Sequence, residues 1–123
     1  MVGDSDLKVA KLYNMLPAEE TGSAEQRTAA DNATVRAVYI VGPDKKIRAM
    51  LLYPMSSGRN FEEVLRLLDS VQLTESKGVA TPVNWQSGDD VIIPPSVSDK
   101  EAKARFPQGF TTLRPYLRTV KID

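Results

Sequence analysis

One arginine lies inside an apolar segment of the sequence, where a charged side chain needs an explanation. Arg36 is the third residue of TVRAVYIV, residues 34–41, and a Gly-Pro-Asp turn sequence follows at residues 42–44. The β-branched and aromatic residues of this segment predict a strand that ends in a tight turn. A guanidinium on a strand reaches solvent at an edge, pairs with a carboxylate, or faces a site that requires a fixed cation. These three alternatives are open for Arg36.

The sequence contains no cysteine and no histidine. The chain by itself therefore has no disulfide, no thiolate nucleophile, no histidine acid or base and no zinc site of the usual kind. Catalysis by this chain alone would use carboxylates, lysine, arginine, tyrosine or hydroxyl groups. A carboxylate-based hydrolase is the weakest alternative, because no paired acidic motif is found. We expect neither a metal nor a cofactor.

The 123 residues suit one domain, or one domain with an appendage. Sixteen basic and sixteen acidic residues cancel, so no overall field favours nucleic acid or an anionic membrane. There is no apolar run long enough to span a bilayer and no signal-peptide pattern at Met1. We therefore expect a cytoplasmic protein with no nucleic-acid or membrane partner.

The elements around Arg36 are predicted from periodicity and turn chemistry. An approximate helical stripe covers residues 6–16, and a hairpin is expected from residues 34–41, a turn, and Ile47–Tyr53. Asn60 is placed to cap a helix, with Glu63 completing a capping box. The apolar face of this helix is expected to pack against the hairpin.

The character of the sequence changes near Glu75, where we place a domain boundary between residues 1–74 and 75–123. Short extended pieces interrupted by prolines follow, with Trp85 as an anchor of this region. Ser98 and Glu101 predict a second capped helix, and residues 113–122 are expected to form a terminal strand. A two-stranded hairpin is a poor free-standing core, which suggests a missing front part or an obligate partner.

The order of these motifs resembles the C-terminal part of the one-cysteine peroxiredoxins of the peroxiredoxin-six type. The segments that carry the resemblance are DLKVAKLY at residues 6–13, RAVYIVGPDKK at 36–46, LYP at 52–54, GRNFEE at 58–63, VATPVNW at 79–85 and GDDV at 88–91. The resemblance implies an α/β fold: part of a thioredoxin-like domain, a β-hairpin plus helix half, followed by a small peroxiredoxin C-terminal domain.

The family reduces hydrogen peroxide and organic hydroperoxides with a cysteine in a Pro-x-x-x-Thr/Ser-x-x-Cys motif, which this sequence lacks. The resemblance therefore implies the C-terminal part of a thiol-specific peroxidase that is inactive alone. The alternative is a non-catalytic dimerisation or binding module derived from the same fold. Expected partners are a hydroperoxide, an external thiol reductant, and a second subunit that pairs through the Ile47–Tyr53 edge and the C-terminal domain.

The resemblance also assigns three residues. Arg36 matches the catalytic arginine that stabilises the thiolate and the peroxide, and Arg59 matches a second active-site arginine. Asp44 matches the aspartate of a Ser-His-Asp set to which a phospholipase A2-type activity is attributed in some animal members. An aspartate in Gly-Pro-Asp is also what a turn prefers, and the turn role is the favoured interpretation of Asp44.

Overall fold

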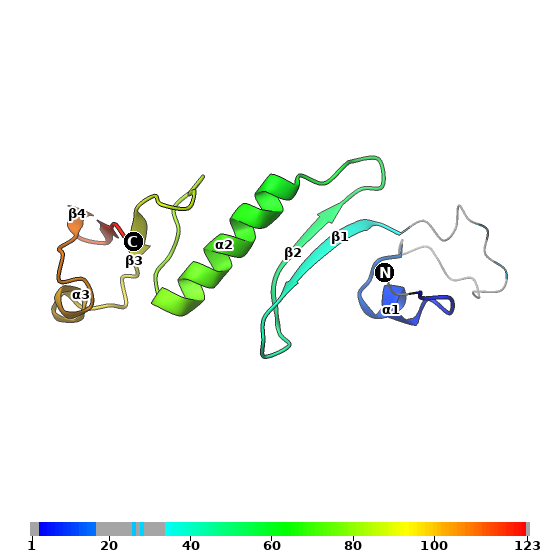
Figure 1. Ribbon diagram of the computed structural model, residues 1–123, viewed down its shortest axis with the longest axis horizontal. Helices are drawn as coiled ribbons and strands as arrows, with labels where there is room; N and C mark the ends of the chain where they lie inside the picture. Colours follow the sequence, from blue (N-terminus) through cyan, green and yellow to red (C-terminus); the bar gives the residue numbers. More distant parts are fainter. Residues whose placement is uncertain (1–2, 17–25, 27, 29–33, 123) are drawn as a thin grey trace. The chain divides into compact units, whose positions relative to one another are not determined.

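The computed structural model describes residues 3–16, 26, 28 and 34–122, and most of its elements are labelled along the chain in Figure 1. The chain divides into two compact units, Met1–Arg59 and Asn60–Asp123. The long helix thus belongs to the same compact unit as the C-terminal elements. The domain boundary at Glu75 stays a prediction. In the described part of the chain, no helix combines the length and apolar character required to cross a membrane.

The first unit is built on the expected hairpin, β1 (Arg36–Val41) and β2 (Ile47–Tyr53), which pair antiparallel with Arg36 opposite Tyr53. The turn between them is closed by two backbone bonds of 2.9 Å, from Lys45 N–H to the Gly42 carbonyl and from Gly42 N–H to the Lys46 carbonyl. Lys45 has φ 64°, in the left-handed region. A left-handed residue after a tight turn matches the right-handed twist of the strands.

The first helix, α1 (Lys8–Leu12), is shorter than the predicted helix over residues 6–16. Leu7 and Asn14 have positive φ values of 56° and 51°, so the helical path is interrupted at both ends. The start is fixed by Asp4, whose carboxylate accepts from Val9 N–H at 3.1 Å and Ala10 N–H at 2.7 Å. The helical spacing of apolar residues in the sequence extends beyond α1, but the helical backbone conformation does not.

The second unit begins with α2 (Phe61–Lys77). Asn60 caps it as predicted, because its side-chain oxygen accepts from Glu62 N–H at 3.0 Å and Glu63 N–H at 3.3 Å. The predicted capping box is incomplete, since the Glu63 carboxylate binds Arg66 instead. The expected contact between the apolar face of α2 and the hairpin stays a prediction.

A three-stranded antiparallel sheet completes the second unit, with β3 (Val91–Ile93), β5 (Leu117–Val120) and β4 (Thr111–Arg114) in that order. The single terminal strand predicted over residues 113–122 is wrong, because the chain turns at Pro115 and Tyr116 into a hairpin. The helix α3 (Asp99–Arg105) is confirmed, together with its Ser98–Glu101 capping box.

The core of the second unit lies between these elements, and Trp85 is 3% exposed within it, which confirms its anchoring role. The other buried members of this cluster are Val79, Val91, Ile93, Ala102, Phe106 and Val120. The indole N–H of Trp85 donates to the Asp89 carbonyl at 3.2 Å. A buried indole usually finds such a partner, because an unpaired N–H away from water is costly.

Candidate functional site

The candidate site is at the open end of the hairpin, where β1 begins and β2 ends. Arg36 is the first residue of β1, and its exposed side chain extends from the strand pair. Its Nε–H donates to the backbone carbonyl oxygen of Met55 at 2.9 Å. That bond uses one of the five guanidinium donors and leaves both Nη groups unpaired with other described residues.

Arg36 differs from three other described arginines in the type of acceptor that it binds. Arg48, Arg66 and Arg118 each pair with a carboxylate, at 3.0, 2.6 and 2.7 Å respectively. Arg36 is held by a neutral carbonyl, so its positive charge is not compensated within the described part of the chain. An oriented and uncompensated cation is what an anion-stabilising site requires.

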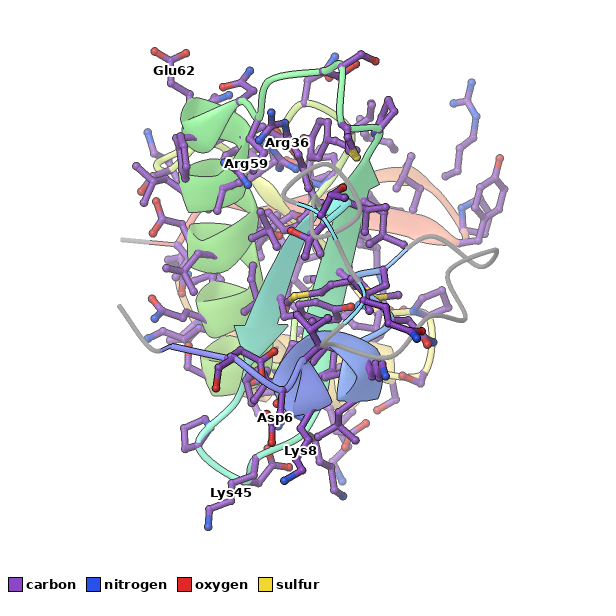
Figure 2. All side chains as sticks on the ribbon, turned by 90° about the vertical axis from the view of Figure 1, so that its right-hand side faces the viewer. Asp6, Lys8, Arg36, Lys45, Arg59 and Glu62 are labelled. Carbon is purple, nitrogen blue, oxygen red and sulfur yellow. The ribbon has the colours of Figure 1, made fainter. Side chains whose placement is uncertain are left out.

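Arg59 lies at the same end of the hairpin as Arg36. Figure 2 labels both arginines there, with Lys45 of the turn at the opposite end. Arg59 is exposed and follows the loop that leaves β2. The structure therefore brings the two predicted site arginines to one end of the first unit.

Asp44 does not share this site. It belongs to the hairpin turn, whereas Arg36 is at the other end of the six-residue strand β1, a span of five steps or roughly 17 Å at about 3.3 Å per residue. Its carboxylate accepts from Lys46 N–H at 3.2 Å and pairs with Arg48 at 3.0 Å. Loss of solvent opposes ionisation of Asp44, but these two contacts outweigh it and hold its pKa below the usual value. These are the contacts of a turn residue, and the hydrolytic assignment stays a prediction.

The other face of the hairpin is apolar. Tyr39 packs edge-on against Tyr13 with ring centroids 5.2 Å apart, and its hydroxyl donates to the Tyr13 carbonyl. The shallow pocket on this side is lined by Leu12, Tyr13, Asn14, Tyr39, Ile47, Met50 and Leu52. Arg36 and Tyr39 are three residues apart on β1 and so point to opposite faces. The apolar pocket is therefore not part of the arginine site.

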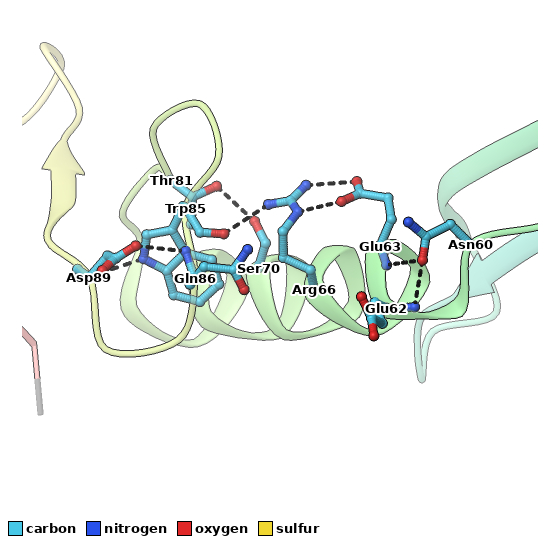
Figure 3. A network of polar contacts seen from close by, with 9 residues as sticks. All are labelled: Asn60, Glu62, Glu63, Arg66, Ser70, Thr81, Trp85, Gln86 and Asp89. Carbon is cyan, nitrogen blue, oxygen red and sulfur yellow. Dashed lines mark hydrogen bonds and ion pairs between the residues drawn. The ribbon is translucent and has the colours of Figure 1, made fainter.

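A polar network in the second unit links α2 to the loop that contains Trp85, as Figure 3 shows. Arg66 binds the Glu63 carboxylate through Nε at 2.6 Å and Nη2 at 2.9 Å, and its Nη1 donates to the Trp85 carbonyl at 3.3 Å. The hydrogen bonds from Arg66 lower the pKa of Glu63 below its usual value. Ser70 and Thr81 share a 2.7 Å hydroxyl bond nearby. The carboxylate compensates the Arg66 charge, so this network is structural.

No group of three or more metal-ligating side chains occurs among the residues that the structure describes. Sequence reasoning predicted Arg36 and Arg59 as site residues but not the Met55 carbonyl as a contact of Arg36, because a backbone acceptor carries no residue-type signal. The nearest signal is Pro54, which favours a turn directly after β2.

Comparison with known proteins relates this chain to one family. A sequence model of the C-terminal domain of 1-Cys peroxiredoxin matches residues 70–109. The mitochondrial peroxiredoxin PRX1 of Saccharomyces cerevisiae is 50% identical over 121 residues, covering 98% of this chain and 45% of that protein. The 1-Cys peroxiredoxin of Dictyostelium discoideum is 47% identical over 119 residues, covering 96% of this chain and 45% of that protein.

Solved structures agree with these sequence matches. The yeast mitochondrial 1-Cys peroxiredoxin superposes with a TM-score of 0.84 at 48% identity, over 98% of this chain and 55% of that chain. Peroxiredoxin 6 of Arenicola marina gives 0.77 at 41% identity, over 94% of this chain and 52% of that chain. The fold is thus that of the peroxiredoxins, which are α/β proteins with a thioredoxin-like fold, as the sequence predicted.

Within that class, the chain is similar over nearly its whole length to part of the 1-Cys peroxiredoxins, and residues 70–109 match the model of their C-terminal domain. It spans about half the length of the curated relatives that it matches. The expected cytoplasmic location is wrong, because the yeast relative with 50% identity is a mitochondrial protein. The lack of a signal-peptide pattern, on which the expected location rests, does not report on targeting in a sequence that covers only 45% of that relative.

Proposed function

We propose that this chain provides the arginine-bearing C-terminal part of a thiol-specific peroxidase that reduces hydrogen peroxide and organic hydroperoxides. The observation that carries the proposal is the Arg36 guanidinium, exposed and held at Nε by the Met55 carbonyl at 2.9 Å. The sequence has no cysteine, so the nucleophile must come from outside these 123 residues.

In this reaction a thiolate sulfur attacks one oxygen of the hydroperoxide and the O–O bond breaks. The sulfur becomes a sulfenic acid, and the other oxygen leaves with the electron pair and takes a proton to become water or an alcohol. A nearby cation favours the thiolate and lowers the thiol pKa from about 8.5. The Nη groups of Arg36 are assigned this role, together with stabilisation of the charge that develops on the leaving oxygen.

Arg59 is proposed as the second cation of the site, since the loop after β2 brings it to the same end of the hairpin. The sulfenic acid must then be reduced by an external thiol. The yeast relative is described as resolved through the glutathione and thioredoxin systems. A low-molecular-weight thiol or a dithiol protein of that kind is the proposed reductant for this chain.

A second subunit is proposed to pair along the outer edge of β2 and through the C-terminal domain. In the described residues β2 pairs on one side only, with β1, so its other edge has free backbone donors and acceptors. An edge of this type is a template for strand addition. The alternative of a purely non-catalytic module finds no support among the relatives, which are peroxiredoxins.

The test joins this chain to the cysteine-bearing part of the yeast relative, with which it is 50% identical. The hybrid is expected to consume hydrogen peroxide with a thiol reductant, whereas the chain alone does not. Arg36→Lys should lower kcat/KM by about 100-fold, as is typical when an oriented donor to a developing anion is lost. Arg114→Lys, an exposed arginine of β4, is the control and should retain activity. Peroxide kinetics of Arg36→Lys equal to those of the unmodified hybrid would refute the proposal.

A further inference from the structure

The loop after β2 contains a closed turn at residues 54–57. Ser57 N–H donates to the Pro54 carbonyl at 2.9 Å. This bond occupies the Pro54 carbonyl, while the Met55 carbonyl oxygen accepts from Arg36 Nε at 2.9 Å. The turn, which directly follows β2, is therefore bound to the other strand of the hairpin, β1, through the Arg36 side chain.

Arg36 is consequently held at two points. Its backbone is fixed in the ladder opposite Tyr53, the last residue of β2, and its Nε is fixed by the turn that begins directly after Tyr53. A guanidinium is planar, so fixing Nε and the Cα position restricts the direction in which the two Nη groups point. The remaining donors form a fork of defined orientation.

We propose that the 54–57 turn is a positioning element that sets the orientation of the Arg36 fork toward the thiolate and the peroxide. The inference rests on the proposed function and adds two positioning residues to it. Pro54 restricts its own φ to about −65°, which limits the conformations of the loop at the start of the turn. Ser57 supplies the N–H that closes the turn.

The chemistry of the acceptor supports this role over a simple packing contact. A carboxylate at the position of the Met55 carbonyl would orient Arg36 equally well but would cancel the charge that favours the thiolate. A backbone carbonyl orients the guanidinium and leaves its charge available. The acceptors of Arg66 and Arg118 include the carboxylates of Glu63 and Asp99. Arg105, like Arg36, binds backbone carbonyls, those of Lys77 and Gly78.

The first test is Ser57→Pro in the hybrid peroxidase, because proline removes the N–H that closes the turn. We expect kcat/KM to fall about 10-fold to 100-fold, the range for misplacement of a catalytic group by about 1 Å. The thiol-ionisation limb of the pH–rate profile should also move up toward about 8.5. Ser57→Ala keeps the N–H and is the conservative variant, which should restore the rate and the pH profile.

A second variant and a second measurement guard against misfolding. Pro54→Gly keeps the Ser57 N–H but loosens the turn, and an upward shift of the same limb, smaller than in Ser57→Pro, is expected. In the chain alone, the Arg36 Nε–H resonance, assigned by its loss in Arg36→Lys, should exchange slowly with water. Ser57→Pro should make that exchange fast while the circular dichroism spectrum is unchanged.

The outcomes distinguish the positioning role of the 54–57 turn from the proposed peroxidase function. An unchanged pH–rate profile in Ser57→Pro and Pro54→Gly, with Arg36→Lys impaired, overturns the positioning role and leaves the proposed function intact. A lower rate with no shift of the profile also overturns it, because loss of folded enzyme lowers the rate at every pH alike. Normal kinetics in Arg36→Lys overturn both.

Discussion

The Arg118 guanidinium donates to the Asp99 carboxylate at 2.7 Å, and the two partners lie in very different environments. The side chain of Arg118 is 6% exposed, whereas that of Asp99 is 78% exposed. The pair links β5 to the first residue of α3. Burying the Arg118 charge costs free energy. Because the Asp99 carboxylate remains in water, most of the interactions that offset this cost must come from the other contacts of Arg118.

Those contacts are two backbone carbonyls in the segment between β3 and α3. Arg118 Nη2 donates to Pro94 O at 3.0 Å and to Val97 O at 2.6 Å. The guanidinium also lies 5.9 Å from the ring centroid of Phe110. The Arg118 side chain thus links β5 both to the loop between β3 and α3 and to α3 itself.

We predict that Arg118→Lys lowers the free energy of unfolding by about 1–3 kcal/mol, the usual penalty for buried acceptors left unpaired. A lysine has a single ammonium group and cannot bind the carboxylate and both carbonyls in one plane. Urea unfolding followed by Trp85 fluorescence measures the loss, because Trp85 is the one tryptophan of the sequence and lies in the same core. Arg114→Lys, whose Nη1 binds only the neighbouring Leu113 carbonyl at 2.9 Å, should change the free energy by less than about 0.5 kcal/mol.

Asp99→Asn should cost less than Arg118→Lys, about 0.2–1 kcal/mol, because an ion pair with an exposed partner contributes little. The two carbonyl contacts of Arg118 remain in this variant. The same urea unfolding experiment compares both substitutions. A larger loss for Asp99→Asn than for Arg118→Lys would show that the ion pair, and not the carbonyl contacts, dominates.

Lys45→Gly should stabilise the hairpin by about 0.5–1 kcal/mol, since a left-handed backbone is strained for a side chain with a Cβ. Lys45 has φ 64° at the turn. Thermal unfolding monitored by circular dichroism tests this. Lys46→Gly, the next residue and the first after the turn, has no positive φ and should be neutral or destabilising. Equal effects of the two substitutions would contradict the assignment of strain to Lys45.

The hairpin, the capped helix α3 and the buried Trp85 were all predictable, because each has a local signal. Gly-Pro-Asp marks a turn, Ser98 and Glu101 form a capping box, and a lone tryptophan among prolines indicates an anchor. The same local signals predicted a strand over residues 34–41 that contains Arg36, and the structure confirms the strand but begins it at Arg36.

The failures involve backbone geometry that depends on contacts between segments. The strand predicted over residues 113–122 ignored Pro115, which ends β4 and allows the chain to reverse into β5. The helix predicted over residues 6–16 followed side-chain periodicity, while the positive φ values of Leu7 and Asn14 limit α1 to Lys8–Leu12. Likewise, the acceptor of Arg36 is a carbonyl 19 positions away, which no residue pattern identifies.

The capping box of α3 makes stability depend on pH. The Ser98 N–H, followed by the Ser98 hydroxyl, binds the Glu101 carboxylate and lowers the pKa of Glu101 below its usual value. A lowered pKa in the folded state means that the unfolded state binds the proton more readily. The contribution of Glu101 is therefore fully present above the unfolded value of about 4.3 and is lost as the pH falls through the lower folded value.

We predict that Glu101→Gln reduces the fall in the free energy of unfolding as the pH is lowered below about 4.3. Glutamine keeps the length of the side chain but does not titrate. Urea unfolding at a series of pH values measures the difference between the variant and the original chain. Parallel pH curves for Glu101→Gln and the original chain would show that the capping carboxylate does not contribute.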